Sequence, residues 1–276
     1  TAQVPVPRPT PAAPGPVATE PGDPSADAAI AEALATLNAD PGSLIRVRDT
    51  LNSILMGPLN SQQRQVVKAK LAELADQWLF GSSVYAGDSL CQTYVVKPGD
   101  QLRIIGERHS VPYEVLMTIN GITRPEALQA GQTLKVVAGP FHGKVSLSAF
   151  TLELYLQNTF VKTYPVGLGK PGFETPTGEW RVRPGDKHIK PPWTDPDTGR
   201  VYRGDDPDYP LGSRWIGLEG LSGNALGRTG FALHGTNDPN QIGRPGSRGC
   251  IRLHNGDAVA VYNMLIPGLS RVRIED

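Results

Sequence analysis

Cys250 and His234 are the two side chains of this sequence best suited to covalent chemistry. Cys250 follows Gly249 in the segment Gly246–Leu253, which surrounds the cysteine with small residues and two arginines. A cysteine becomes a nucleophile when a nearby base or positive charge populates its thiolate. The glycine before it permits a sharp turn that leaves backbone N–H groups pointing at the sulfur, and such groups form an oxyanion hole. The segment therefore predicts acyl transfer at Cys250.

His234 is the candidate base for this cysteine. An apolar strand, Phe231–Leu233, leads into the histidine, and Gly235 breaks the strand directly after it. A buried, inert residue is the commoner fate of a lone cysteine, and a satisfied core histidine is the commoner fate of a lone histidine. Two Gly-flanked sites together favour a catalytic pair. His254 has no apparent partners for metal ligation, so we expect neither a metal nor a cofactor.

Residues 140–276 resemble the catalytic domain of the L,D-transpeptidases, the cysteine enzymes of bacterial cell walls. The matching motif is a His-Gly pair, a spacer, and then Ser-X-Gly-Cys followed by arginine, with an upstream Gly-Lys and Thr-Pro-X-Gly element. These stand here as His234-Gly235, Ser247-Arg248-Gly249-Cys250-Ile251-Arg252, Gly169-Lys170 and Thr175-Pro176-Thr177-Gly178. Arg248 departs from the family, which often has histidine there, and this difference affects the expected substrate contacts.

The resemblance implies that Cys250 attacks the carbonyl between the third residue of a tetrapeptide stem and its terminal D-alanine. His234 acts as general acid and base, oriented by a backbone carbonyl, and the N–H groups of Gly249 and Cys250 hold the oxyanion. An amine from a neighbouring stem then completes a 3→3 cross-link, whereas water as acceptor would make the enzyme an L,D-carboxypeptidase. The residues expected to contact substrate are Arg252, Ser247, Arg248, Gly235 and Trp215.

Three of these substrate-contact predictions have structural alternatives. Arg252 either fixes the catalytic loop or binds a substrate carboxylate. Ser247 is better suited to shaping the loop by hydrogen bonding than to acting as a nucleophile. Trp215 either lines the substrate groove or packs in the core, and the surrounding Pro- and Gly-rich segment, residues 183–224, is predicted to be a long loop or lid. Lys187 in that segment either meets a stem carboxylate or lies in solvent.

Upstream, residues 93–137 follow a strand–helix–helix–strand pattern and resemble the lysin motif. The matching segments are Tyr94–Leu102, Ile119–Gly121 and Leu128–Leu134. The resemblance implies a βααβ module that binds N-acetylglucosamine-containing glycans such as peptidoglycan, and the candidate glycan-binding residues are Gly99, Asp100, Asn120 and Gly121. Asp100 is also placed to cap the first helix, and Gly106 should weaken that helix by up to about 1 kcal/mol.

The remaining pattern predicts an α+β, multidomain chain. Residues 1–24 form a Pro- and Ala-rich linker, and residues 25–90 form three amphipathic helices of unknown role, the first capped by Ser25. Residues 140–276 are strand-rich, which predicts a mainly β sandwich or open barrel with one helix near residues 256–266.

Charge and cysteine content limit the partners. The 27 basic and 27 acidic residues cancel, so no overall field favours nucleic acid or an anionic membrane. No apolar run is long enough to span a membrane, and we expect an exported protein of the periplasm or cell wall, tethered by a segment absent from this chain. A disulfide between Cys91 and Cys250 would instead leave a non-catalytic peptidoglycan-binding scaffold.

Overall fold

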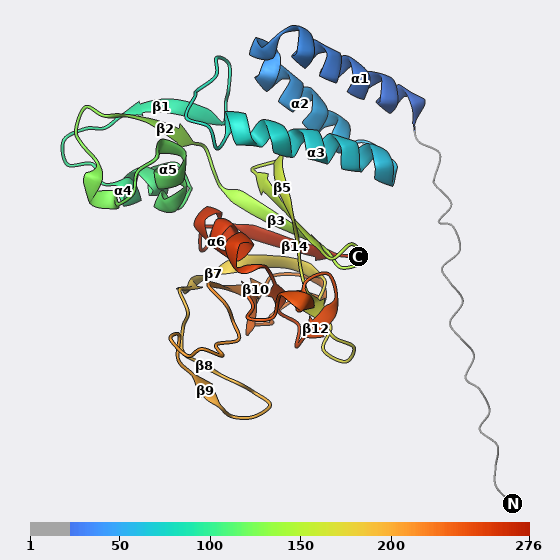
Figure 1. The fold of residues 1–276 in the computed structure, drawn as a ribbon, viewed down its shortest axis with the longest axis vertical. Coiled ribbons are helices and arrows are strands. Elements are labelled where there is room, and N and C mark those ends of the chain that lie inside the picture. The colour runs from blue at the N-terminus through green and yellow to red at the C-terminus, as the bar shows by residue number, and fades with distance from the viewer. Residues whose placement is uncertain (1–22) are drawn as a thin grey trace, which may run out of the picture.

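The structure is a computed structural model that describes residues 23–276, in which a three-helix region, a βααβ unit and a curled β-sheet follow one another along the chain (Figure 1). The linker predicted for residues 1–24 lies almost wholly outside the described residues. Within the described part, no helix has both the length and the apolar character needed to cross a membrane. The α+β class predicted from the sequence is confirmed.

The helical region consists of α1 (Pro24–Ala39), α2 (Leu44–Leu55) and α3 (Ser61–Trp78). The prediction that Ser25 caps the first helix is wrong. Asp23 is the N-cap, because its carboxylate accepts from the Ser25 N–H and Pro24 then occupies the first helical position, where its fixed φ suits a helix start. A capping box between Asn60 and Gln63 starts α3.

The βααβ unit contains β1 (Cys91–Val95), α4 (Leu102–Arg108), α5 (Tyr113–Asn120) and β2 (Thr133–Val137), with the two strands antiparallel. Gly121 ends α5 in the left-handed conformation. Asp100 does not cap α4. Its carboxylate accepts instead from the Tyr94 hydroxyl and the Lys97 N–H, which shapes the turn before the helix. Gly106 is required by close packing, since a Cβ there would lie 2.7 Å from the Val111 carbonyl oxygen.

The third region is built on an eight-stranded sheet in the order β13-β11-β10-β7-β14-β3-β4-β5. One end of the sheet is an antiparallel meander of three strands that are consecutive in the chain: β3 (Phe141–Ser146), β4 (Thr151–Leu156) and β5 (Thr159–Pro165). The other strands are β7 (Gly178–His188), β10 (Trp215–Gly220), β11 (Phe231–His234), β13 (Ile251–Arg252) and β14 (Arg271–Glu275), and α6 (Asn255–Met264) packs beside β10 and β11.

The prediction of one long loop over residues 183–224 is wrong in part. β7 continues to His188, and β10 lies inside the sheet between β7 and β11. The buried run Ile216–Leu218 is short and interrupted by a glycine, so its strand character is masked by the Pro- and Gly-rich residues around it. Two minor pairs complete the fold: β6 (Leu168–Gly169) with β12 (Pro245–Ser247), and β8 (Trp193–Thr194) with β9 (Val201–Tyr202).

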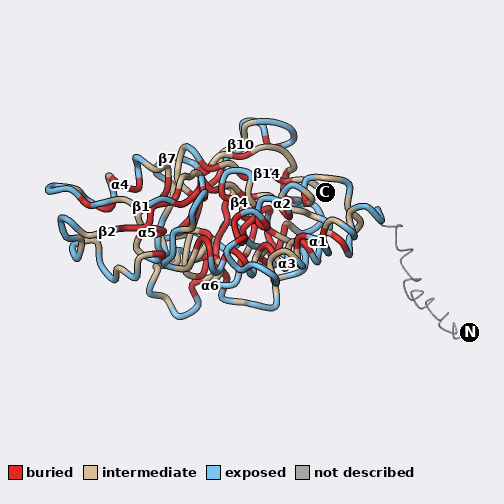
Figure 2. The backbone as a smooth tube through the Cα atoms, turned by 90° about the horizontal axis from the view of Figure 1, so that it is seen from above, coloured by how far each residue is buried: buried red, intermediate tan, exposed pale blue. Residues whose placement is uncertain are grey.

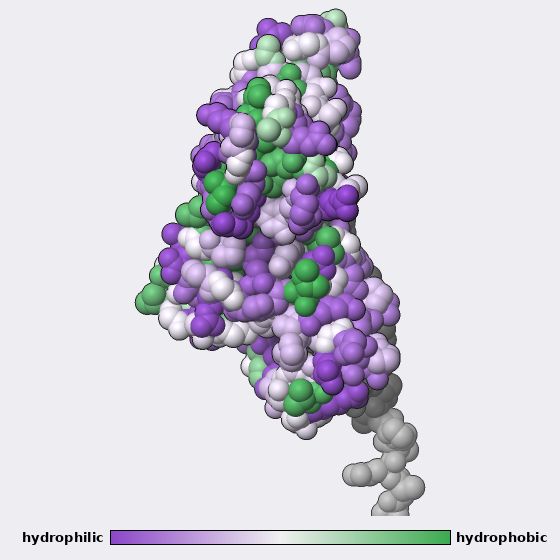
Figure 3. Space-filling model, turned by 90° about the vertical axis from the view of Figure 1, so that its left-hand side faces the viewer, coloured by the Kyte–Doolittle hydropathy of each residue, from purple (hydrophilic) through white to green (hydrophobic). Residues whose placement is uncertain are grey.

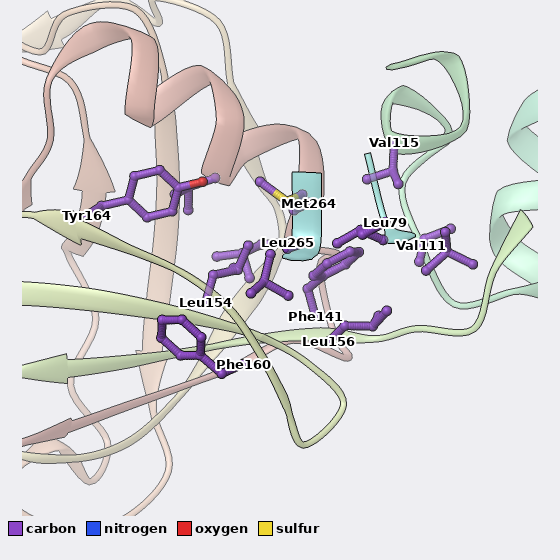
Figure 4. Close-up of a cluster of buried hydrophobic side chains, with 14 of the residues drawn as sticks. Leu79, Val111, Val115, Phe141, Leu154, Leu156, Phe160, Tyr164, Met264 and Leu265 are labelled. Carbon is purple, nitrogen blue, oxygen red and sulfur yellow. The ribbon is translucent and has the colours of Figure 1, made fainter. Parts of the chain in front are cut away.

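The three regions share one continuous apolar core, visible as the buried segments through the centre of Figure 2. Figure 4 shows where they meet: Leu79 after α3, Val115 of α5 and Met264 of α6 point into the same cluster as Phe141 and Leu156 of the sheet. The outer face shown in Figure 3 is mostly hydrophilic, with smaller groups of hydrophobic residues.

Polar contacts join the same regions. Lys135 of β2 is 4% exposed as a residue. Its ammonium donates to the carbonyls of Trp78, the last residue of α3, and of Gly81 and Ser83 just after it. On the other side, the Asn52 amide of α2 donates to the Asn158 carbonyl and accepts from the Phe160 N–H. Because β5 is an edge strand, these last two bonds and α3 cover an edge that would otherwise be unpaired.

Candidate active site

Two adjacent parallel strands bring the predicted catalytic pair together. His234 is the last residue of β11, and Cys250 directly precedes β13. The register pairs Leu233 with Ile251 and His234 with Arg252. The sheet therefore converts a separation of sixteen positions in the sequence into neighbouring positions on two strands.

The His234 ring is fixed from two sides. Its Nδ1 atom lies 2.6 Å from the Gly235 carbonyl oxygen, and its plane stacks on Trp215 with a centroid distance of 5.7 Å. Because a carbonyl only accepts, Nδ1 carries the proton in the neutral ring, and the lone pair is on Nε2. Trp215 is itself held by a hydrogen bond from its Nε1 to Asp186. Trp215 thus supports the histidine directly, which neither sequence alternative for it anticipated.

Burial determines the charge of this histidine. His234 is 3% exposed, and desolvation together with the Arg252 guanidinium lowers its pKa from 6.5 to about 4, against the opposing effect of hydrogen bonds to the backbone of Gly235 and Leu211. The ring is therefore neutral at neutral pH. A neutral imidazole has one unprotonated ring nitrogen, which is able to accept a proton.

Cys250 is half-buried and carries a free thiol. Burial raises the pKa of the thiol, while a hydrogen bond from the Ala232 backbone and the Arg252 guanidinium act in the opposite direction. Its Sγ atom lies 3.9 Å from the Gly230 carbonyl oxygen. Within residues 23–276, no hydrogen bond joins Cys250 to His234. The arrangement is that of a protonated thiol beside a neutral base.

The loop before Cys250 is held by Ser247. The Ser247 hydroxyl donates to the Cys250 carbonyl at 2.6 Å and accepts from the Gly249 N–H at 3.0 Å. Ser247 is 2% exposed, and its hydroxyl is engaged within the loop by both of these bonds. Gly249 has a φ of +105°, and a Cβ there would overlap the Phe231 ring, so only glycine fits before the cysteine.

The two backbone donors predicted for an oxyanion hole differ in availability. The Gly249 N–H is already engaged by Ser247. In the described part of the chain, the Cys250 N–H has no hydrogen-bond acceptor. The Cys250 N–H is consequently the donor of the pair that is free to bind an oxyanion in this arrangement.

Arg252 and Arg248 lie in different surroundings. The buried Nη1 of Arg252 and the buried Oε1 of Gln241 both lack hydrogen-bond partners in the described structure, and both face Gly246. Arg248 instead forms an ion pair with Asp197, and its guanidinium lies 4.6 Å from the Phe173 ring centroid. Arg248 therefore bridges two loops, whereas Arg252 keeps an unused donor two residues from the cysteine.

Sequence comparisons decide the family. The family model described as the L,D-transpeptidase catalytic domain, YkuD, matches residues 140–274, and the LysM domain model matches residues 94–137. The L,D-transpeptidase YkuD of Bacillus subtilis is 33% identical over 189 residues, which cover 66% of this chain and 98% of that relative. The chain belongs to the L,D-transpeptidase family.

One further relative and one solved structure are more distantly similar. The L,D-transpeptidase YcfS of Escherichia coli is 28% identical to this family member over 194 residues, covering 63% of this chain and 58% of YcfS. An L,D-transpeptidase structure from Mycobacterium tuberculosis has 19% identity and a TM-score of 0.39, covering 54% of this chain and 64% of that one. This chain thus spans a little under two thirds of that solved chain.

The segment between β7 and β10 of this L,D-transpeptidase carries a small hairpin. β8 and β9 pair through Trp193 and Tyr202, whose ring centroids are 6.0 Å apart. Asp197, in the turn between the two strands, is the partner of Arg248, so the hairpin is joined to the loop that holds Cys250. Lys187 is partly buried, and its ammonium donates to the Tyr262 and Leu265 carbonyls at the end of α6.

In the LysM region, two of the candidate glycan-binding side chains are used internally. The Asn120 amide donates to the Leu116 and Lys135 carbonyls and accepts from the Lys135 N–H. Asp100 is bonded to Tyr94 and Lys97, as described above. Gly99 and Gly121 both have positive φ at turns. Asp100 and Asn120 therefore both make hydrogen bonds within the module.

Sequence reasoning missed three polar residues of the site: Asp197, Gln241 and Asn255. Asp197 and Gln241 belong to segments without periodicity. Asn255 is the first residue of α6, after His254 at the N-cap, and the Gly256 beside it obscures the start of this helix in the sequence. In residues 23–276, no group of three or more His, Cys, Asp and Glu side chains is arranged to hold a metal ion.

Proposed function

We propose that this chain is a peptidoglycan L,D-transpeptidase in which Cys250 forms an acyl-enzyme with a tetrapeptide stem. The observation that carries the proposal is the neutral, buried His234 on the strand next to Cys250, with its Nδ1 on the Gly235 carbonyl. Family membership supports the same reaction class.

In the proposed first step, the Cys250 thiol turns from the Gly230 carbonyl toward His234, and Nε2 takes its proton. The thiolate attacks the carbonyl carbon that joins the third stem residue to D-alanine. Negative charge then develops on the carbonyl oxygen, where the free Cys250 N–H donates. His234 passes its proton to the leaving amine as the C–N bond breaks, and a thioester with Cys250 remains.

In the second step, an amine of a neighbouring stem attacks the thioester. His234 takes a proton from this amine and returns it to the departing sulfur, which leaves a 3→3 cross-link and the free enzyme. Arg252, with its unused Nη1 donor near the cysteine, is the residue we expect to bind a substrate carboxylate. Water in place of the amine would give the carboxypeptidase reaction.

The LysM region supports a peptidoglycan partner, because a glycan-binding module beside stem-peptide chemistry recognises two parts of one polymer. We accordingly propose the periplasm or cell wall as the location. The alternative of an oxidised, non-catalytic scaffold is contradicted in its specific form, since Cys91 and Cys250 are both free, and Cys91 lies buried against the end of α3.

The test is incubation of the full chain with a disaccharide-tetrapeptide, followed by mass spectrometry. A dimer that has lost D-alanine supports transpeptidation, whereas tripeptide alone identifies a carboxypeptidase. Cys250→Ala should abolish both products and the thioester adduct, and Cys91→Ala should leave them intact. Unchanged turnover in Cys250→Ala contradicts the mechanism.

Glycan binding is tested separately with the Cys250→Ala protein, which cannot turn over substrate. The protein should sediment with insoluble peptidoglycan, and soluble N-acetylglucosamine oligomers should compete. Sedimentation that these oligomers do not reduce would show that the LysM region is not the binding element.

A further inference from the structure

The first residue of α6 connects the two loop segments that flank His234. The Asn255 Nδ2 donates to the Thr236 carbonyl at 2.9 Å, and its Oδ1 accepts from the Ser213 N–H at 2.9 Å. The Ser213 hydroxyl donates in turn to the Asn255 backbone carbonyl at 2.8 Å. One side chain therefore joins residues 234–236 to residues 211–214 and ties both to the start of a helix.

These two segments carry the backbone groups that bond the catalytic ring. Gly235 provides the carbonyl that holds Nδ1, and the backbone of Leu211 forms the second hydrogen bond that acts on His234. A bond from the Gly235 N–H to the Arg214 carbonyl adds a direct link between the segments. The spacing of the two segments consequently decides where the ring sits.

The packing at this junction leaves no space for adjustment. A Cβ on Gly212 or on Gly235 would overlap the Asn255 Oδ1 atom, and a Cβ on Gly235 would also lie 2.8 Å from the Ser213 nitrogen. Both segments approach the amide as bare backbone. Removing the amide would take the acceptor from the Ser213 N–H and the donor from the Thr236 carbonyl.

We propose that Asn255 is a positioning residue, which holds these two segments at the spacing that keeps the Nδ1–H of His234 on the Gly235 carbonyl. This inference rests on the proposed role of His234 as the base. Among the described residues, Asn255 forms no hydrogen bond with Cys250, so we expect it to act through the histidine, by fixing the tautomer and orientation of the ring.

The chain offers a matched control in Asn52. Its amide makes the same pair of bonds, one to a backbone carbonyl (Asn158) and one from a backbone N–H (Phe160), at 3.1 and 3.0 Å. It lies at the α2–β5 contact, remote from β11 and β13 in the sheet order. Asn52→Ala therefore removes equivalent bonds, and measures what their loss does to the fold alone.

The experiment compares Asn255→Ala, Asn255→Asp and Asn52→Ala in the full chain by three measurements: release of D-alanine, thermal unfolding, and ring ¹⁵N NMR shifts of His234. Both alanine variants should unfold at lower temperature. In Asn255→Ala, kcat should fall about tenfold to a hundredfold with KM little changed, because small misplacements of catalytic groups have effects of this size. The ring should also change from one Nδ1–H tautomer to a mixture.

A single Nδ1–H tautomer in Asn255→Ala, or a kcat within about tenfold of that of Asn52→Ala, overturns the inference. If Asn255→Ala does not fold, Asn255→Asp takes its place under the same criteria, because it keeps the acceptor for Ser213 and loses only the donor to Thr236. The proposed function is tested separately by His234→Gln. If this variant forms the Cys250 thioester at the wild-type rate, the proposed function is wrong, independently of the tautomer found in the Asn255 variants.

Discussion

Replacing His234 with glutamine should change how the stability of the protein depends on acid. In the folded chain the pKa of His234 is lowered to about 4, whereas its ordinary value is 6.5. Between these two values the unfolded chain binds a proton that the folded chain does not. Acidification therefore favours unfolding, and the contribution of this residue is complete above pH 6.5 and is lost as the pH falls toward 4.

The size of this effect follows from the difference between the two pKa values. A lowering from 6.5 to about 4 corresponds to a loss of about 2 kcal/mol of unfolding free energy by pH 5 and about 3 kcal/mol by pH 4. Glutamine does not titrate, so the variant lacks this loss. Because burial also lowers the pKa of His109 and His142, only the difference between wild type and variant isolates His234.

The assay is urea unfolding of both proteins at pH values from 7.5 to 4. The wild-type curve should fall toward the His234→Gln curve, or further below it, by the amounts given above. Parallel curves would show that burial does not hold His234 neutral. A wild type that gains stability relative to the variant on acidification would mean that the folded ring is charged, as in a thiolate–imidazolium pair, and would refute the resting state described for Cys250.

Three further outcomes test other contacts. Lys135→Met should lower the unfolding free energy by roughly 2 to 4 kcal/mol in urea unfolding, because three carbonyls near the end of α3 lose a charged donor. Lys70→Met is the control, since it removes an exposed ion pair with Glu73. This variant should change the unfolding free energy by less than about 1 kcal/mol. Asp197→Asn removes the ion pair to Arg248, and should speed alkylation of Cys250 by a bulky maleimide; an unchanged rate would show that the hairpin does not restrict access. A thiol reagent should label Cys250 before Cys91 in the native protein, since burial raises the pKa of the Cys91 thiol to about 12; equal labelling rates would contradict the buried placement.

The placement of Cys250 and His234 at neighbouring strand ends could be predicted from the sequence, because the signals that mark these ends are local. A glycine directly before Cys250 and another directly after His234 mark turns at strand ends, and the apolar residues leading into His234 mark the strand. The helices and the β3–β5 meander were equally predictable, since each shows its own periodicity.

The supporting contacts could not be predicted, because their partners are distant in sequence. Arg248 meets Asp197 across 51 positions, and Asn255 meets Ser213 across 42. For Lys187 the sequence left open a stem carboxylate or solvent, and for Asn120 it predicted glycan binding. The Lys187 ammonium instead donates to two backbone carbonyls, and the Asn120 amide bonds backbone groups of Leu116 and Lys135. In these cases tertiary hydrogen bonds, which no local pattern records, determined the role.

Lys135 and α5 attach the LysM region rigidly to the rest of the protein, which limits the stem peptides that Cys250 would reach when the LysM region is bound to glycan. A binding module on a flexible linker lets a catalytic domain search every stem within the linker's reach. Here the module shares its core with α3 and α6, so the offset between a bound sugar and Cys250 is set by the protein. We expect such an enzyme to react with stems at a fixed distance along the glycan strand from the bound sugar. Its cross-links would then be regularly spaced, and not spread over all stems that a flexible linker could reach.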